Sequence, residues 1–509
     1  MSIPQPSSAP AVREAGDPST SVRAALRSPR RLKTEVLAGL VVALALIPEA
    51  ISFSIIAGVD PRVGLFASFT MAVTIAITGG RPAMISAATG AVALVIAPLV
   101  REHGLDYLIA TVLLAGALQI VLSAAGVARL MRFVPRSVMV GFVNALAILI
   151  FTSQLPYLIG VPALVYPLVV AALLVMVLLP KLTTAIPAPL IAIVILTSVV
   201  LLFGLRVPNV GDEGELPSSL PHLLLPQVPL TPATLTIIAP YALAMALVGL
   251  LESLMTAKLV DDITDTHSNK TREGWGQGVA NLVTGLFGGM GGCAMIGQTM
   301  INVKVSGART RISTFLAGLF LLGLVVGLGD VVGTIPMAAL VAVMIMVSVG
   351  TFDWHSIHPS TLRRMPRSET LVMVATVAVT VATSNLAYGV IVGSVTAMVL
   401  FARRVAHLVT VSKVDTPDTD DDTVVYRVTG ALFFASSNDL VYQFDYGGDP
   451  RRVVIDMTDS HIWDASTVAA LDAVSTKYRA WGKEVEIVGL DPDSAERRDR
   501  LSGRLGAPE

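Results

Sequence analysis

Long apolar segments follow one another along most of the chain and predict a bundle of membrane-spanning helices. An α-helix needs about 20 apolar residues to cross about 30 Å of hydrocarbon. Three weaker segments, 63–78, 86–100 and 279–300, are shorter or rich in Gly, Ala and Ser. Hydropathy alone therefore predicts ten or eleven crossings, and up to fourteen with the weak ones. The clear candidates are 36–57, 107–127, 137–155, 164–179, 186–205, 235–255, 313–328, 331–349, 371–383 and 388–404.

The pattern changes after about residue 411 and predicts a small soluble domain. An acidic linker at 415–422 is followed by short β-branched runs and by an amphipathic stretch at 465–481. Strands that alternate with a helix indicate an α/β domain. The β-branched runs lie at 424–428, 431–434, 453–457 and 485–488. We expect a tail at 1–33, a transport domain at 34–411 (halves 34–206 and 233–411), and a linker with the α/β domain at 412–509.

Composition supports a membrane protein. Of the 509 residues, 53% are hydrophobic and only 14% are charged, whereas soluble domains carry about a quarter charged residues. The first thirty or so residues are rich in Pro, Ser, Ala and Arg and lack an apolar signal core, so we interpret them as a disordered tail. The single cysteine, Cys293, excludes an intramolecular disulfide. We find no phosphate-binding loop, metal cluster or nucleophile–base set, so we expect neither an enzyme nor a cofactor.

Charge predicts how the chain lies in the membrane. If fourteen segments cross, all the basic clusters fall on the side of the N-terminus, with Arg101 as the main exception. This is the positive-inside pattern, so both termini are expected in the cytoplasm of a multi-pass protein of the plasma membrane, the bacterial inner membrane. The net charge of −1 gives no indication of nucleic-acid binding, and we expect no nucleic-acid partner. The clusters lie at 23–33, 129–136, 258–272, 304–311, 363–367 and 403–404.

Two segments rich in small residues, 86–90 and 288–299, are the best candidates for a substrate site. Unwound backbone inside a membrane is tolerated only against protein or a water-filled cavity. Short Gly-interrupted segments in matching places of two halves indicate a transporter site. A helix that begins there would direct free N–H groups at an anion. The alternative is that the small residues only permit close helix packing.

Two acidic residues lie within apolar segments. Glu49 is in the first segment, and Glu252 is in the first segment of the second half, with Thr256 on the same helix face. A carboxylate at a helix centre costs at least about 2.5 kcal/mol, so such residues usually face a cavity. A buried carboxyl is more readily protonated than an exposed one, which makes proton binding near neutral pH possible. The alternative is a structural carboxyl that is hydrogen-bonded to a helix terminus.

These motifs together resemble the SulP anion transporters, the sulfate-permease relatives. The resemblance rests on the stretch 38–54 around Glu49 with 58–64, on 86–90, on 252–256 with 269–281, and on 288–302. The soluble end resembles a STAS domain, which usually ends SulP chains. The family implies about fourteen spans in two inverted seven-span repeats, a core and a gate region, and an anion bound between the short third and tenth helices.

The resemblance implies a set of site residues. Glu252 and Glu49 would couple the transport to protons, with Thr256 as support. The substrate-binding residues would be Phe53, Ser86, Ala87, Ala88, Thr89, Ala294, Met295, Ile296, Gly297 and Gln298.

Three departures from the family shape the functional hypothesis. Glu49 stands where many relatives have Gln, Glu252 where sodium-coupled bicarbonate members have Asp, and Gln298 where several relatives have Arg. Extra acid and less positive charge beside an anion site lead us to expect proton–anion symport by alternating access. The substrate would be a small inorganic or carboxylate anion such as sulfate, bicarbonate or a dicarboxylate like fumarate.

Other functions stay open at the level of sequence. A nucleobase permease of the same architecture would share the acidic eighth span but normally lacks a STAS domain. An anion channel would pass current without a coupled gradient, and a sensor would show no flux.

In the soluble domain, Ala465 occupies the position where soluble STAS proteins carry a phosphorylated Ser, although Ser466 follows. We therefore expect a scaffold or dimer role for this domain, and a homodimer.

Overall fold

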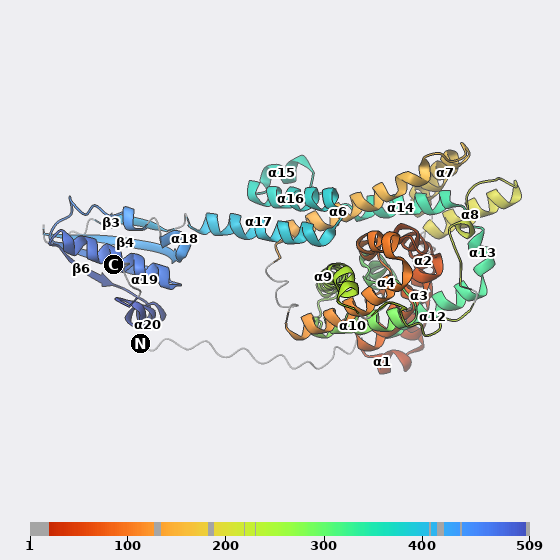
Figure 1. The fold of residues 1–509 in the computed structure, drawn as a ribbon, viewed down its shortest axis with the longest axis horizontal. Helices are drawn as coiled ribbons and strands as arrows, with labels where there is room; N and C mark the ends of the chain where they lie inside the picture. The colour runs from red at the N-terminus through yellow and green to blue at the C-terminus, as the bar shows by residue number, and fades with distance from the viewer. Residues whose placement is uncertain are drawn as a thin grey trace. The chain divides into compact units, whose positions relative to one another are not determined.

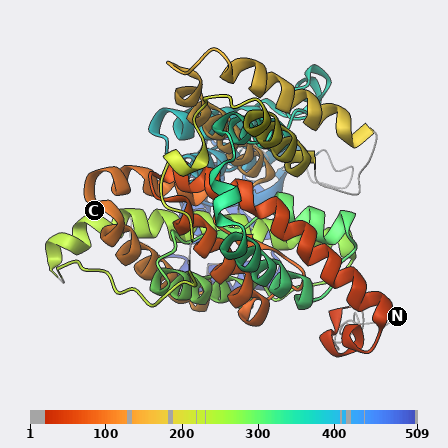
Figure 2. The ribbon, with the colours of Figure 1, turned by 90° about the vertical axis from the view of Figure 1, so that its right-hand side faces the viewer.

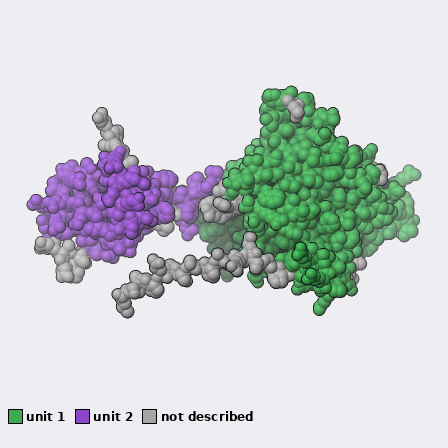
Figure 3. All heavy atoms as spheres, turned by 90° about the horizontal axis from the view of Figure 1, so that it is seen from below, with its two compact units in different colours: residues 1–393 green, residues 394–509 purple. Residues whose placement is uncertain are grey.

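The computed structural model describes residues 20–126, 134–181, 188–217, 219–229, 231–406, 409–414, 422–437 and 440–504. The expected tail up to residue 19, most of the basic cluster 129–136 and most of the acidic linker lie outside these residues. The chain forms two compact units, Met1–Gly393 and Ser394–Glu509, shown in different colours in Figure 3. Each unit is described by itself.

The first unit is helical. Within the described residues, six helices are long and apolar enough to cross a membrane, and four shorter apolar helices accompany them. Its first part contains α1 (Val22–Leu26), α2 (Pro29–Ala57), α3 (Pro61–Thr78), α4 (Gly90–Ala124), α6 (Arg136–Gln154), α7 (Val165–Leu178) and α8 (Ala188–Leu202). Its second part contains α9 (Pro232–Thr264), α10 (Lys270–Leu286), α11 (Ile296–Met300), α12 (Arg311–Gly327), α13 (Gly329–Gly333), α14 (Met337–Thr351), α15 (Pro359–Arg364), α16 (Arg367–Thr383) and the start of α17 (Leu386–Ala406), whose residues from Ser394 belong to the second unit.

The helices of this unit pack in two groups. The helices α2, α3, α4, α9, α10 and α12 contact one another, and α6, α7, α8, α14 and α16 form a second group (Figure 1). The gold helices α7 and α8 lie side by side in Figure 2. Close approach of α4 and α10 depends on glycine, because a Cβ at Gly116 would lie 2.7 Å from the carbonyl oxygen of Gly278. Small residues therefore also serve helix packing in this unit.

Two of the three weak segments of the sequence become interrupted elements, whereas 63–78 forms the continuous helix α3. The long helix α4 is broken at Gly104, whose φ of 82° is not helical, so Gly90–Ala124 consists of two helical stretches that begin after strand β1. The glycine-rich segment 288–292 separates α10 from β2 (Cys293–Ala294) and α11. A π-helical turn at Ile301–Val305 follows α11 directly.

The second unit contains a four-stranded sheet in the order β3-β4-β5-β6. Its strands are β3 (Thr410–Val414), β4 (Thr423–Leu432), β5 (Arg452–Ile462) and β6 (Glu484–Val488). β3 is antiparallel to β4, and the other pairs are parallel. The helices are α18 (Phe434–Ser437), α19 (Ala465–Ala480) and α20 (Pro492–Leu501).

The expected strands 424–428 and 431–434 were wrong as separate elements. Residues 424–428 and 431–432 belong to the single strand β4, because its ladder with β5 continues past a register shift between Arg427 and Thr429 to the pair Leu432 and Ile462. The expected strand also ran too far, since Phe434 begins α18. The edge strand β3 was missed, because its five residues include only two apolar side chains, Val411 and Val414.

A buried carboxylate organises the core of this second unit. Asp449 accepts hydrogen bonds from the hydroxyls of Tyr426 (2.8 Å) and Tyr478 (2.5 Å), and Lys413 lies 2.8 Å away. Burial by itself would raise the pKa of Asp449, but these hydrogen bonds, led by that of Lys413, hold its pKa below the ordinary value. The carboxylate thereby ties β3, β4 and α19 together.

Candidate functional site

The two broken segments meet in the first unit. β1 (Ser86–Ala87) pairs antiparallel with β2, with Ser86 opposite Ala294 and Ala87 opposite Cys293. A Cβ at Gly292 would overlap the carbonyl oxygen of Ala87, so the glycine is required by this close approach. The ladder thus joins two segments that are far apart in the sequence.

Each strand leads into a helix, and both helices start beside the ladder of β1 and β2. Thr89 is the N-cap of α4, and its hydroxyl accepts the amide hydrogen of Val92 at 3.4 Å. Met295 is the N-cap residue of α11. The first amides of a helix lack partners within the helix and carry partial positive charge. The α4 start is therefore suited to an anion.

A cavity of about 370 Å³ adjoins these helix starts. Eight of the expected site residues line it: Glu49, Phe53, Thr89, Glu252, Met295, Ile296, Gly297 and Gln298. Gly90, from the predicted segment 86–90, also lines it, whereas the other lining residues were not predicted from the sequence: Phe142, Val143, Leu146, Ile150, Val347, Gly350 and Thr351. Most of these are ordinary apolar or small positions of α6 and α14, which only the packing brings to the cavity.

The remaining expected site residues are not among the lining residues. The hydroxyl of Ser86 accepts a hydrogen bond from the Gln277 amide at 2.6 Å, and Thr256 donates to the carbonyl oxygen of Glu252 at 2.8 Å. Ala87 and Ala88 are buried, and the amide of Ala294 donates to the Ser253 hydroxyl at 3.1 Å. These residues hold the backbone around the cavity.

The two acidic residues reach the cavity from different helices. Glu252 on α9 is 6% exposed, and its Oε2 accepts a hydrogen bond from the Cys293 thiol at 2.9 Å. The same sulfur lies 3.1 Å from the hydroxyl oxygen of Thr89. Glu49 on α2 lines the cavity together with Gln298. Both carboxyls therefore lie beside the helix starts.

Comparison with known proteins identifies the family. The Sulfate permease family matches residues 32–167 and 161–376, and the STAS domain matches 414–502. This chain belongs to the sulfate permease family. It is a membrane transporter of that family, not an enzyme, and it ends in a STAS domain.

Similar proteins span nearly the whole chain. YbaR of Bacillus subtilis, provisionally named a sulfate transporter, is 52% identical over 91% of this chain and 95% of its own length. The bicarbonate transporter BicA of Picosynechococcus is 25% identical over 93% and 91% of the two chains. The fold resembles SLC26A9, with a TM-score of 0.78 at 16% identity over 92% and 86% of the two chains. The transmembrane domain of a cyanobacterial BicA gives a TM-score of 0.63 at 26% identity, over 73% and 98%.

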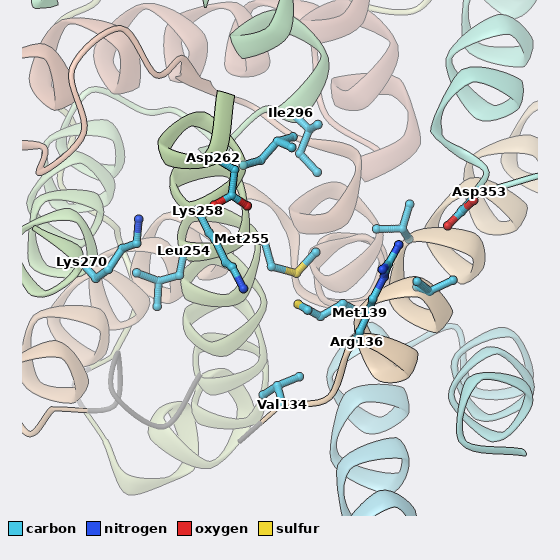
Figure 4. A pocket seen from close by; sticks show the side chains of 13 residues that line it. Val134, Arg136, Met139, Leu254, Met255, Lys258, Asp262, Lys270, Ile296 and Asp353 are labelled. Atoms are coloured by element: carbon cyan, nitrogen blue, oxygen red, sulfur yellow. The ribbon is translucent and has the colours of Figure 1, made fainter. Parts of the chain in front are cut away.

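In this member of the sulfate permease family, a larger cavity of about 720 Å³ adjoins the first. The two cavities share the lining residues Val143 and Ile296. Figure 4 shows Arg136 on α6 and Lys258 on α9 at its wall, together with the carboxylates of Asp262 and Asp353. Positive side chains therefore line the larger cavity, whereas the smaller one has no Lys or Arg among those of its lining residues that the structure describes.

A polar network supports the segment before β1 in this sulfate permease relative. Arg81 contacts Asp261 at 3.0 Å, and Lys270 contacts the other oxygen of Asp261 at 2.5 Å. The buried carboxylate of Glu273 accepts the backbone amide hydrogens of Gly80 and Arg81, each at 2.8 Å. Asp261 thus helps to fix the loop that leads to Ser86.

Proposed function

We propose that this sulfate permease relative is a secondary active transporter that moves a small anion together with protons. One observation carries the proposal: among the described residues, two carboxyl groups and no Lys or Arg line a cavity at the start of α4. An anion there would gain from the helix amides. It would be repelled by an ionised carboxylate, since like unit charges about 5 Å apart repel by about 3 kcal/mol at an effective dielectric constant of about 20.

Protonation of Glu252 or Glu49 removes this repulsion. The anion and the proton then bind cooperatively, which is the thermodynamic requirement for symport. Two carboxyls allow up to two protons to accompany one anion, so the transport of a dianion would be electroneutral. In this proposal Phe53, Thr89 and the residues from Met295 to Gln298 contact the anion, and Ser86, Ala87, Ala88, Ala294 and Thr256 support them.

The walls of the cavity favour alternating access as the mechanism. Glu49, Thr89 and Glu252 belong to one helix group, whereas Phe142 and Val347 belong to the other. A rigid-body movement between the groups would separate the two walls. We place the larger cavity, with Arg136 and Lys258, on the cytoplasmic side of a bacterial inner membrane, with both termini there, because basic residues favour that side.

The substrate class that we propose is sulfate, bicarbonate or a dicarboxylate such as fumarate. The names of the relatives, a sulfate transporter and a bicarbonate transporter, support the inorganic anions. The apolar wall of Phe142, Leu146 and Ile150 also suits the carbon chain of a dicarboxylate. We further propose a homodimer in which the STAS domain takes part, as the family resemblance implies.

Uptake into proteoliposomes tests the function. Radiolabelled sulfate, bicarbonate, fumarate and uracil are offered with and without an inward proton gradient. We expect gradient-driven accumulation of one anion and its loss in Glu252→Gln. Wild-type uptake that does not depend on the gradient would refute proton coupling through Glu252. Gradient-driven uptake by Glu252→Gln would refute it as well. Selective uptake of uracil would instead identify a nucleobase permease, and anion current without a coupled gradient would identify a channel.

A further inference from the structure

Cys293 lies between the acidic residue of α9 and the N-cap of α4. Its sulfur is 2.9 Å from Oε2 of Glu252 and 3.1 Å from the hydroxyl oxygen of Thr89, and its side chain is fully buried. Glu252 and Thr89 both line the 370 Å³ cavity, whereas Cys293 is not among its lining residues. The three side chains form a continuous hydrogen-bonded chain that begins and ends at the cavity.

The geometry points to Cys293 as a positioning residue that couples protonation of Glu252 to the presentation of the Thr89 hydroxyl to the anion. This inference rests on the proposed function, because it assumes that Glu252 takes up the coupled proton. It assigns a role to a residue that does not touch the substrate. The role follows from the donors and acceptors that each of the three groups has.

When Glu252 is ionised, its carboxylate can only accept hydrogen bonds. The thiol hydrogen of Cys293 is then directed at Glu252, and the sulfur is left as an acceptor for the hydroxyl hydrogen of Thr89. The Thr89 oxygen also accepts the Val92 amide hydrogen. In this state Thr89 has no hydrogen to donate into the cavity.

When Glu252 is protonated, every hydrogen bond of the chain reverses. The carboxyl hydrogen of Glu252 is donated to the sulfur, and the thiol hydrogen of Cys293 is donated to the Thr89 oxygen. That oxygen keeps the Val92 amide as its second donor, so the hydroxyl hydrogen of Thr89 turns toward the cavity and the anion. No covalent bond other than the new O–H of Glu252 forms, because the thiol and hydroxyl hydrogens only rotate.

The Glu252 side chain joins this hydrogen-bonded chain directly, through its contact with Cys293. Glu252 packs with its helix against α4, α10, β2 and α11. Among the described residues, Cys293 from β2 is its hydrogen-bonding partner, and Glu49 on α2 is the other titratable group that lines the cavity. The charged residues of α10 are engaged elsewhere: Lys270 with Asp261, Arg272 with the carbonyl oxygens of Ile77 and Thr78, and Glu273 with the amides of Gly80 and Arg81.

The remaining charged groups of the neighbouring helices also have local contacts. On α4, Arg101 donates to the carbonyl oxygen of Ala97, and Glu102 lies near His103. The other titratable residues of α4 are Asp106, which accepts the amide of Gln227, and Tyr107, which stacks against His103. The helix α11 has no charged residue.

Transport kinetics of full-length Cys293→Ala and Cys293→Ser test the relay. Both are reconstituted in proteoliposomes, and KM is measured at an acidic and an alkaline pH for whichever of sulfate, bicarbonate or fumarate the wild type takes up. The serine hydroxyl donates and accepts as the thiol does, whereas alanine does neither. We expect this added hydrogen bond to contribute about fivefold to tenfold to the gain in anion affinity that the wild type and Cys293→Ser show at acidic pH. That contribution should be lost in Cys293→Ala, whereas the gain from relief of charge repulsion should remain, so the ratio of KM values at the two pH values should shrink about fivefold to tenfold.

A matched control removes a buried hydroxyl outside the cavity. Thr284→Val breaks the 2.7 Å hydrogen bond between Thr284 and Thr70 in the same unit and should keep the wild-type ratio of KM values. A Cys293→Ala protein with the wild-type ratio overturns the relay while proton coupling stands. A wild type without gradient-driven uptake overturns the proposed function, and the relay with it.

Infrared spectroscopy of the wild type provides a second readout that needs no substitution. Cys293 is the only cysteine of the chain, so the S–H stretching band belongs to it alone. Hydrogen bonds to a charged acceptor are stronger than those to a neutral one. Acidification should therefore move the band to higher frequency as the thiol exchanges a carboxylate for a hydroxyl acceptor. A band that does not move between the two pH values overturns the relay, even if Cys293→Ala fails to fold.

Discussion

Ser86 lies opposite Ala294 in a two-residue antiparallel ladder that holds the two broken segments of the membrane unit together. The adjoining pair is Ala87 and Cys293, and the amide of Met295 extends the contact by donating to the carbonyl oxygen of Ile85 at 2.8 Å. The ladder fixes the starts of α4 and α11 at one edge of the cavity. The site is therefore built by backbone pairing as much as by side chains.

Gly292→Ala should disrupt this ladder. The added Cβ would overlap the carbonyl oxygen of Ala87, which is backbone and cannot rotate away. We expect a loss of at least about 1–3 kcal/mol of stability and most of the uptake activity. Thermal unfolding in detergent and uptake in proteoliposomes measure the two effects. Gly323→Ala on α12 is the control, because a Cβ there meets nothing within 4 Å. Normal uptake by Gly292→Ala would show that the close approach is not needed.

Glu49→Gln should lower the number of protons that accompany each anion. The amide is nearly isosteric with the carboxyl group but adds no negative charge to the cavity. We expect KM for the anion at alkaline pH to fall about tenfold or more, since a like charge at about 5 Å repels by about 3 kcal/mol. Parallel measurement of proton and anion flux gives the stoichiometry. Glu102→Gln removes the same charge from an exposed position and should change neither quantity. An unchanged stoichiometry in Glu49→Gln would leave Glu252 as the sole carrier.

Asp261→Asn should destabilise the membrane unit. It removes the charge partner of Arg81, whose side chain is only 3% exposed, and of Lys270. Breaking one side of a buried ion pair typically costs about 3–5 kcal/mol. Thermal unfolding in detergent should show a clearly lower midpoint for this variant. Asp262→Asn, at the next position on the wall of the larger cavity, is the matched control and should be close to the wild type. Equal midpoints for the two variants would contradict the role of Asp261.

Asp449→Asn should destabilise the STAS domain in a pH-dependent way. The pKa of Asp449 is held below its ordinary value, so its ionised form stabilises the fold at neutral pH, and this contribution is lost as the pH falls through the folded-state pKa. We expect a loss of about 3 kcal/mol at neutral pH that shrinks below about pH 4. Hydrogen exchange of β4 and β5 in the full chain measures it. Asp445→Asn, whose side chain is 61% exposed, is the control. Equal protection in both variants at neutral pH would argue against a structural role for Asp449.

The apolar pattern determined much of the fold. Helices have to run through hydrocarbon because every backbone polar group must be paired there, so 36–57 and 235–255 could be predicted as helices and became α2 and α9. Alternation of β-branched runs with an amphipathic stretch indicated the α/β unit. Local spacing could not show that two runs form one strand, because the ladder between β4 and β5 depends on a partner about thirty positions away.

The sequence by itself also singled out the residue types of the site: the glycine-rich breaks and the two acidic residues within apolar segments. Such residues are costly in lipid and so stand out in any apolar run. Only the tertiary structure decided that Glu252 contacts Cys293, that Ser86 points at Gln277, and that α6 and α14 supply the opposite wall. Those relations join positions far apart in the chain, and apolar wall residues such as Phe142 look like any other lipid-span residue until the helices pack around them.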